Sequence, residues 1–180
     1  RCSHCNVERP LAIIHRRIIE VCCDENSLIG QSSPYTVGCE MIRITIKDDA
    51  TTLKGIMKTL DAIRGPMDLV IMSSMCTGGS RRVMMNWRVG PLTRTKIIGH
   101  WDVFKIMKNV LWIIVVKCSQ TGATVVNEWP TGCLYWTDEH IVECIKEFGL
   151  NKINMYGCQY GVASNKEKTW GFPIKKPWTL

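Results

Sequence analysis

Short apolar runs alternate with amphipathic segments along the first half of this chain of 180 residues. The runs at 18–23 (IIEVCC), 41–46 (MIRITI) and 68–74 (DLVIMSS) are short and mostly apolar, which predicts buried strands. Between the second and third runs, residues 51–63 place apolar side chains at helical spacing, and a Gly-Pro pair follows as a stop. Strands that alternate with helices predict an α/β fold, here a mostly parallel, Rossmann-like sheet with flanking helices.

The second half of the chain continues this alternation. We expect an irregular basic segment at 82–96, a helix at 98–118, a strand at 123–130 and a second helix at 138–149. Two strands of a final hairpin follow at 153–162 and 170–180. The apolar tail of the first helix, LWIIVV, also suits a strand. We expect an N-terminal extension at 1–17 and a single α/β domain at 18–180.

The net charge of the chain indicates the kind of partner to expect. Twenty-three Lys and Arg against sixteen Asp and Glu give a net charge of +7, which favours a polyanion such as a nucleic acid, either RNA or DNA. The alternative is a solvated basic surface without a partner. No apolar run reaches the roughly 18 residues that span a bilayer, so no membrane partner is expected. The first residue is Arg1 rather than Met, which suggests a domain of a longer polyprotein.

Ten cysteines also bear on the cellular compartment. Several of them lie in apolar runs, where a free thiol packs as a small hydrophobic side chain, so we expect an intracellular, reducing compartment, the cytoplasm or the nucleus. Cys2 and Cys5 have the spacing of half a zinc site, but no second pair follows at matching spacing. We therefore expect no metal site.

Candidate chemistry gathers where the predicted strands end. In α/β sheets a ligand binds at the carboxyl ends of the strands, and this rule selects 24–27, 76–80, 127–130 and 160–168. Cys76 ends the third strand and is followed by two glycines and two arginines, an environment that can lower the pKa of a thiol. The alternative is a buried thiol beside a structural turn.

Three short motifs resemble the cytosine C5 methyltransferases, a group of class I S-adenosylmethionine-dependent methyltransferases. SSMCTGGS at 73–80 resembles their Pro-Cys loop, with Met75 where proline is usual. VVNEWP at 125–130 resembles their Glu-Asn-Val motif, with Trp129 in place of Asn. QYGVASNKEK at 159–168 resembles their Asp-Tyr-Gly-Val-Pro-Gln-Asn-Arg-Glu-Arg stretch. Segments of this kind also resemble parts of viral or retroelement polyproteins.

This resemblance implies a cofactor, S-adenosylmethionine, and two catalytic residues. Cys76 would be the nucleophile that attacks C6 of the pyrimidine, and Glu128 would hold the edge of the base. Residues at the strand ends would contact the cofactor, with helix capping as the alternative role: Asp24, Glu25, Asn26, Asp48, Asp49 and Ser74. The family has a glycine-rich turn after the first strand, whereas this chain has Cys-Cys-Asp-Glu-Asn-Ser there.

Basic and aromatic side chains are the candidates for contact with nucleic acid. Those expected to bind phosphates are Arg81, Arg82, Arg88, Lys166 and Lys168. Four aromatic side chains would stack on bases if they are exposed and would otherwise belong to the core: Trp87, Trp129, Tyr135 and Trp136.

Three functional hypotheses remain at this stage. The first is a nucleic-acid methyltransferase that acts on cytosine C5 through Cys76. The second keeps the cofactor but methylates an RNA ribose or cap, which needs no covalent cysteine. The third is a non-catalytic α/β module of a polyprotein that binds nucleic acid or a protein.

Overall fold

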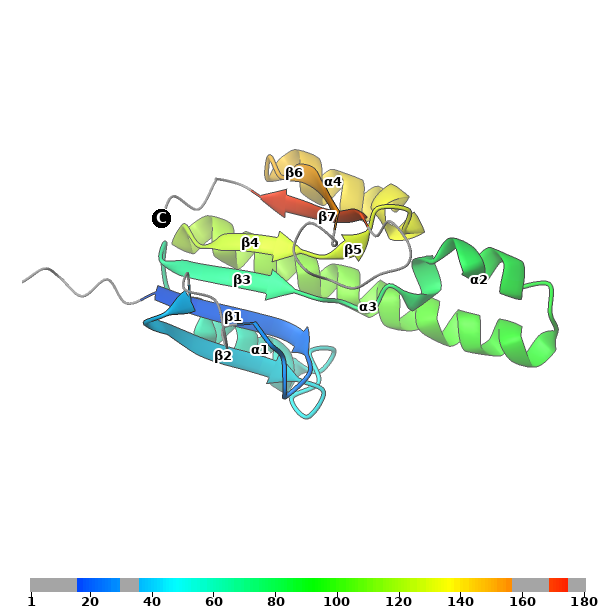
Figure 1. Cartoon of the computed structure of the whole chain (residues 1–180), viewed down its shortest axis with the longest axis horizontal. Helices are drawn as coiled ribbons and strands as arrows, with labels where there is room; N and C mark the ends of the chain where they lie inside the picture. The colour runs from blue at the N-terminus through cyan, green and yellow to red at the C-terminus, as the bar shows by residue number, and fades with distance from the viewer. Residues whose placement is uncertain (1–15, 30–35, 157–168, 175–180) are drawn as a thin grey trace, which may run out of the picture.

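The computed structural model describes residues 16–29, 36–156 and 169–174 (Figure 1). Its strands are β1 (Arg16–Cys23), β2 (Cys39–Thr45), β3 (Asp68–Met72), β4 (Thr124–Asn127), β5 (Trp129–Pro130), β6 (Asn151–Tyr156) and β7 (Thr169–Ile174). Its α-helices are α1 (Leu53–Ala62), α2 (Arg81–Asn86), α3 (Pro91–Thr121) and α4 (Glu139–Glu147). Two short 3-10 turns lie at Thr77–Gly79 and Leu134–Thr137.

The first four strands form a parallel sheet in the order β2-β1-β3-β4. The register places Ile19 of β1 between Ile42 of β2 and Val70 of β3, and Val70 in turn pairs with Val125 of β4. Because all four strands run the same way, their carboxyl ends meet at one edge of the sheet, which we call the carboxyl edge, and their amino ends meet at the opposite amino edge. The predicted α/β class and the parallel strands are thus confirmed.

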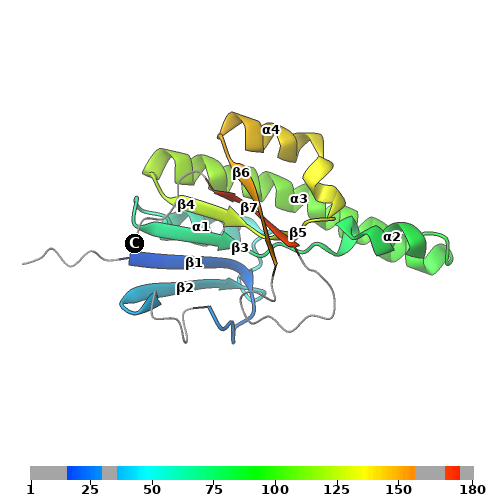
Figure 2. The ribbon, with the colours of Figure 1, turned by 45° about the horizontal axis from the view of Figure 1, so that its top comes forward.

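The last three strands form an antiparallel sheet in the order β5-β7-β6. The chain enters it directly from β4, since Glu128 alone separates β4 from β5, and β7 lies close to β4 (Figure 2). The predicted final hairpin agrees with the antiparallel pairing of β6 with β7. The prediction of a mostly parallel sheet therefore holds for β1 to β4 and not for this second sheet.

Helix α3 packs against α1, α4 and β4, and α1 packs against β1 and β2. The core between these helices and the sheets is apolar because the strands direct alternate side chains toward it. Its least exposed members are Ile19, Val21, Ile44, Ile63, Val70, Met72, Val110, Ile114, Val115, Cys118, Val125, Trp129, Ile141 and Cys144. None of the helices in the described ranges combines the length and the apolar character that a bilayer crossing requires.

The amino edge is held by a buried ion pair. Arg17 Nε donates to Asp68 Oδ1 at 2.8 Å, and Arg17 Nη2 donates to Asp68 Oδ2 at 2.7 Å. The same Oδ2 accepts the backbone N–H groups of Arg64 at 2.6 Å and Gly65 at 2.8 Å. This carboxylate therefore joins the starts of β1 and β3 to the turn that follows α1.

The prediction of an irregular segment at 82–96 is wrong, because two helices form there. Ser80 caps α2 by accepting the Arg82 N–H on its hydroxyl, and Pro91 opens α3 directly after Gly90. Helix α3 continues through LWIIVV to Thr121, so this tail is helix rather than strand. Trp87 and Trp101 stack with ring centroids 5.3 Å apart and hold the two helices together.

Candidate functional site

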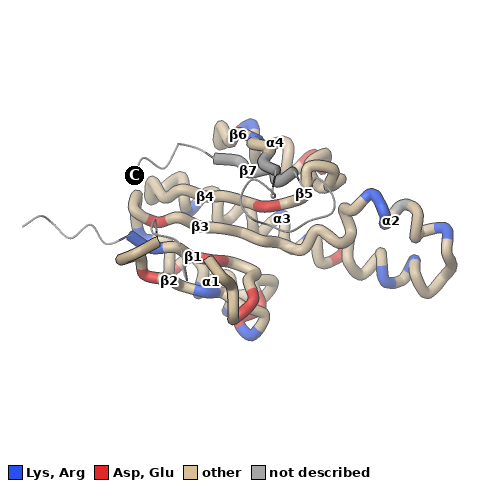
Figure 3. Tube along the Cα trace, viewed as in Figure 1, with Lys and Arg blue, Asp and Glu red and all other residues tan. Residues whose placement is uncertain are grey.

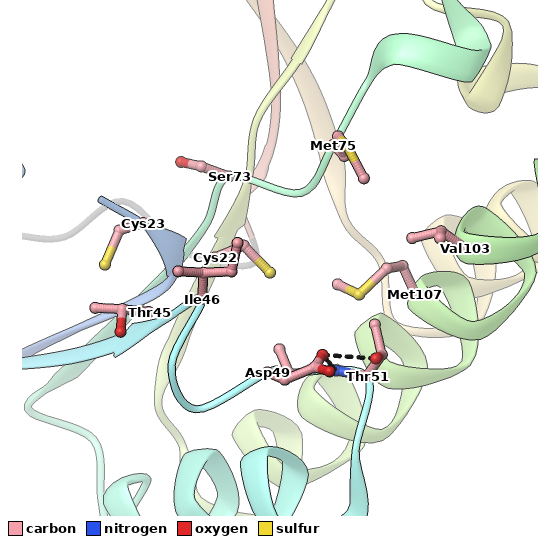
Figure 4. A pocket seen from close by; sticks show the side chains of 11 residues that line it. Cys22, Cys23, Thr45, Ile46, Asp49, Thr51, Ser73, Met75, Val103 and Met107 are labelled. Atoms are coloured by element: carbon pink, nitrogen blue, oxygen red, sulfur yellow. Dashed lines mark hydrogen bonds between the residues drawn. The ribbon is translucent and has the colours of Figure 1, made fainter. Parts of the chain in front are cut away.

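A cavity of about 270 Å³ opens at the carboxyl edge (Figure 4). Its walls come from the ends of β1, β2 and β3 and from one side of α3. The lining residues are Cys22, Cys23, Thr45, Ile46, Asp49, Ala50, Thr51, Ser73, Met75, Val103 and Met107. The cavity is mainly apolar, and Asp49 is its acidic group.

The end of β1 turns sharply at the cavity. Cys22 has a backbone φ of 62°, in the left-handed region that glycine favours, and the register of β1 with β2 shifts between Val21 and Cys23. Burial, with smaller contributions from Cys23 and Asp49, raises the pKa of Cys22 to about 11, so this thiol stays protonated at neutral pH. The backbone thus bends sharply within the last residues of β1 although the sequence has no glycine there.

The turn after β2 presents Asp49 to the cavity. Asp49 also has a positive φ, of 47°, and its Oδ1 accepts the Thr51 N–H at 3.0 Å and the Thr51 hydroxyl at 2.6 Å (Figure 4). These bonds from Thr51 lower the pKa of Asp49. The backbone of this turn lies close to Gly55 of α1, and only glycine leaves room for it, since a Cβ there would lie 2.6 Å from the Asp48 carbonyl oxygen.

The loop after β3 is fixed from two sides. Ser73 N donates to the Val21 carbonyl of β1 at 3.1 Å, and the Trp129 Nε1 donates to the Ser74 carbonyl at 3.1 Å. The Ser74 hydroxyl also donates to Asn127 Oδ1 at 3.2 Å. These bonds fix the two residues before Met75, which is 51% exposed and forms one wall of the cavity.

Cys76 follows Met75 and is half-buried at the start of the Thr77–Gly79 turn. Cys76 and Glu128 both contribute to the raised pKa of the Cys133 thiol, so both groups lie close to Cys133. Two glycines allow this packing. A Cβ on Gly79 would lie 2.5 Å from Cys133 Sγ, and one on Gly78 would lie 3.0 Å from the Trp101 ring.

Two neighbours of Cys76 are held in their neutral forms. Burial raises the pKa of Cys133 to about 11, and burial raises the pKa of Tyr135 to about 12, with nearby cysteines adding to both. Tyr135 also stacks on Phe104 with ring centroids 3.5 Å apart. Neither Cys133 nor Tyr135 therefore supplies a thiolate or phenolate at neutral pH.

Met75 separates the cavity from the surroundings of Cys76. Met75, Val103 and Met107 line the cavity and also a narrow gap that reaches Gly78 and Tyr135. This gap has no room for a water molecule. Cys76 is absent from the linings of both spaces, so the nucleophile of the sequence hypothesis lies beside the cavity and not inside it.

The predicted cofactor residues divide into two groups. Asp49 lines the cavity, and Ser74 is buried and follows the lining residue Ser73. The others are absent from the lining, and each has another partner. Asp24 accepts the Asn26 N–H at 2.8 Å, Glu25 pairs with Lys47 at 2.7 Å, and Asp48 pairs with Lys58 at 2.6 Å.

The predicted nucleic-acid contacts divide in the same way. Arg81, Arg82 and Arg88 are exposed on and beside α2, whereas Lys166 and Lys168 lie outside the described residues. Among the aromatic candidates, Trp129, Tyr135 and Trp136 are buried in the core, which rules out base stacking by them in this structure. Trp87 is half-buried against Trp101.

Several cavity residues were not selected from the sequence. Thr45 ends β2 and Ser73 directly follows β3, so the strand-end rule could have included them. Val103 and Met107 lie one helical turn apart on α3, and nothing local distinguishes them from ordinary core positions. Their role depends on where α3 packs, which the sequence does not reveal.

No group of three or more His, Cys, Asp or Glu side chains suited to a metal ion occurs within 16–29, 36–156 and 169–174. Cys2 and Cys5 lie outside these ranges. Comparisons of the chain with protein-family models, with curated proteins and with solved structures found no match.

Proposed function

We propose that this protein is an S-adenosylmethionine-dependent methyltransferase that acts on nucleic acid, built on a Rossmann-like sheet. The position of the cavity carries this proposal. The order β2-β1-β3-β4 reverses direction at β1, because the chain moves outward to β2 and then crosses to β3. In doubly wound sheets the ligand binds at such a switch point, outside the carboxyl ends of the strands. The cavity is lined by residues from these same strand ends.

The lining suits the nucleoside part of the cofactor. Met75, Val103 and Met107 offer an apolar surface to an adenine ring, and Asp49 can accept hydrogen bonds from ribose hydroxyls. The Asp49 carboxylate has lone pairs to spare after its two bonds from Thr51, because a carboxylate offers about four acceptor sites. The volume of about 270 Å³ lies just below the roughly 300 Å³ at which small-molecule sites begin, so the cavity suits the nucleoside part rather than the whole cofactor.

Cys76 and Glu128 would act on the target base. The Cys76 thiolate would add to C6 of a cytosine and make C5 nucleophilic, and Glu128 would hold the edge of the base. S-adenosylmethionine supplies the methyl group when it is bound. Loss of the C5 proton to a base then restores the ring double bond and releases the Cys76 thiolate. Met75 lines both the cavity and the closed gap beside it, so its side chain would have to move for the methyl group to reach a base held at Cys76.

Calorimetric titration with S-adenosylhomocysteine tests the cofactor site. We expect binding by the wild-type chain and at least tenfold weaker binding by Asp49→Ala, because Asp49 lines the cavity. Asp24→Ala is the matched control, since Asp24 is absent from the lining. Absence of binding by the wild-type chain at millimolar ligand would refute the proposal and favour a non-catalytic binding module.

Methyl transfer from labelled S-adenosylmethionine to DNA and RNA tests the role of Cys76. We expect Cys76→Ser to abolish transfer to cytosine while S-adenosylhomocysteine still binds. Cys39→Ser is the control, because Cys39 begins β2 at the amino edge. Undiminished transfer by Cys76→Ser would exclude the covalent route and favour methylation of an RNA ribose or cap.

A further inference from the structure

Residues 81–101 form a helical hairpin that projects beyond the sheet, and we call it the arm (Figure 1). It consists of α2, the connection at 87–90 and the first three turns of α3. It starts five residues after Cys76, so it projects from the same end of the molecule as the Cys76 loop.

The arm carries only positive charge. Five cationic side chains and no Asp or Glu occur between residues 81 and 101. All five cations are exposed, and they follow the hairpin along both helices (Figure 3): Arg81, Arg82, Arg88, Arg94 and Lys96. Arg81 is the first of them along the chain after the Cys76 loop, and its Nε would lie 3.6 Å from a Cβ on Gly132, the residue before Cys133.

The arm is braced at its base and along its length. Trp101 Nε1 donates to the Gly78 carbonyl at 3.0 Å, which joins α3 to the turn that follows Cys76. The Trp87 ring stacks on Trp101, and the Arg94 guanidinium lies over Trp87 at 5.7 Å while its Nε donates to the Trp87 carbonyl at 3.0 Å. A ligand on the arm would therefore be held at a fixed position relative to Cys76.

The end of the arm exposes apolar side chains between its cations. Met85 is 72% exposed, Val89 73% and Leu92 83%. Val89 and Leu92 flank Gly90 and Pro91 at the point where the chain turns from α2 into α3. Apolar side chains beside arginines suit a groove whose walls are phosphates and whose floor is made of base edges.

We propose that the arm binds double-stranded DNA, with its arginines on the phosphates and the Val89–Leu92 turn in a groove. Helices are about 10 to 12 Å in diameter, and the major groove of B-form DNA is about 12 Å wide. The major groove of A-form RNA is too narrow for side chains to read, so the shape of the arm favours DNA. The choice of nucleic acid as partner rests on the proposed function.

Fluorescence anisotropy with a labelled 20-base-pair DNA duplex, without methyl donor, tests this proposal. For the triple variant Arg81→Gln, Arg82→Gln, Arg88→Gln we expect at least tenfold weaker binding at about 50 mM salt. The slope of log affinity against log salt should fall by about 0.9 for each phosphate that the variant no longer neutralises. The matched control removes three exposed cations from elsewhere, with Lys54→Gln, Arg64→Gln and Lys146→Gln, and should change the affinity less than threefold.

Two further measurements separate the possible outcomes. Val89→Ser with Leu92→Ser should weaken duplex binding while leaving the salt slope unchanged, because it removes apolar side chains from the groove and no charge. An RNA duplex of the same sequence should bind at least tenfold more weakly than the DNA. Equal losses in the arm and control triples, or preference for RNA, would overturn the assignment. Failure of S-adenosylhomocysteine to bind would refute the methyltransferase proposal while leaving this binding result standing.

Discussion

The two edges of the parallel sheet are built on opposite principles. At the amino edge, the Asp68 carboxylate is buried and accepts four hydrogen bonds from Arg17 and the 64–65 backbone. At the carboxyl edge, Cys22 and Asp49 both have positive φ and a cavity lies between the strand ends. At the amino edge a buried charge has its hydrogen-bond partners, and at the carboxyl edge strained backbone lies beside the cavity.

This difference supports a division of roles, in which the amino edge serves stability and the carboxyl edge serves the proposed binding. Buried polar groups that have all their partners fix the positions of strands, whereas unusual backbone conformations persist where the surrounding structure enforces them and cluster at ligand sites. Substitutions at the amino edge should therefore cost stability, and those at the carboxyl edge should change the local turn and the binding.

The largest effect is expected at the amino edge. Asp68→Ala leaves Arg17 buried without a partner and two backbone N–H groups unbonded, so it should lower the free energy of unfolding by about 4 to 5 kcal/mol. Arg17→Met leaves Asp68 its two backbone donors and should cost less, about 3 kcal/mol. Urea unfolding monitored by circular dichroism measures both. Equal losses of unfolding free energy in the two variants would contradict the role given to the backbone N–H donors.

The next effect concerns the packing under the Cys76 loop. Gly79→Ala would place a Cβ 2.5 Å from Cys133 Sγ and against the Tyr135 ring, so it should lower the free energy of unfolding by about 1 to 3 kcal/mol. Gly99→Ala is the control, because it lies in α3 with nothing within 4 Å and should stabilise by up to about 1 kcal/mol. Thermal unfolding distinguishes these opposite signs. A stabilising Gly79→Ala would show that the loop is loosely packed.

A smaller effect should appear at the strained end of β1. Cys22→Gly should be more stable than Cys22→Ala by about 1 kcal/mol, because alanine keeps the strain of the left-handed conformation and glycine removes it. This order is the reverse of the usual one, in which the alanine variant is more stable than the glycine variant. At Cys23, whose φ is not positive, alanine should be the more stable substitution. The denaturant midpoints of the four variants test this order of stability. A higher midpoint for the alanine variant at both sites would argue against a strained turn.

The smallest effect is the acid sensitivity of the turn after β2. The hydrogen bond from Lys58, and then that from the Thr45 backbone, lowers the pKa of Asp48 below its ordinary 3.8. A lowered carboxyl pKa adds stability that is fully present above the unfolded pKa of 3.8 and is lost as the pH falls from there through the lower folded pKa. Lys58→Met should reduce that loss by less than about 1 kcal/mol, since the pair is exposed. Unfolding curves between pH 3 and 6 test it, and an unchanged pH dependence would mean that the pair contributes nothing.

The parallel sheet was predictable because its strands and α1 carry strong local signals. IIEVCC, MIRITI and DLVIMSS are apolar in short blocks, and α1 has one apolar face. Helix α2 was missed since RRVMMNW shows little periodicity and a Gly-Pro pair follows it. Its stability comes from the Ser80 cap and from Trp87 stacked on Trp101, and that stacked pair joins residues fourteen positions apart.

The candidate site was predictable only in outline. The strand-end rule found Asp49, because a carboxylate after an apolar strand is conspicuous in a sequence. It could not separate Asp49 from Asp48, since their directions depend on the turn made at φ 47°. The glycine-like turn at Cys22 was hidden for a related reason, because cysteine has no preference for positive φ and only the tertiary structure imposes it.

Helix α3 spans 31 residues, or about 46 Å at 1.5 Å per residue, and it has no break. Along it lie in succession the arm, the Trp101 bond to Gly78, the cavity wall at Val103 and Met107, and the core at Val110 and Ile114. A continuous helix behaves as a lever, so a tilt imposed at its exposed end also shifts the cavity wall. If the arm and the cavity each bind a ligand as proposed, and one ligand favours such a tilt, their occupancies are thermodynamically linked, and by reciprocity each ligand changes the affinity for the other by the same factor.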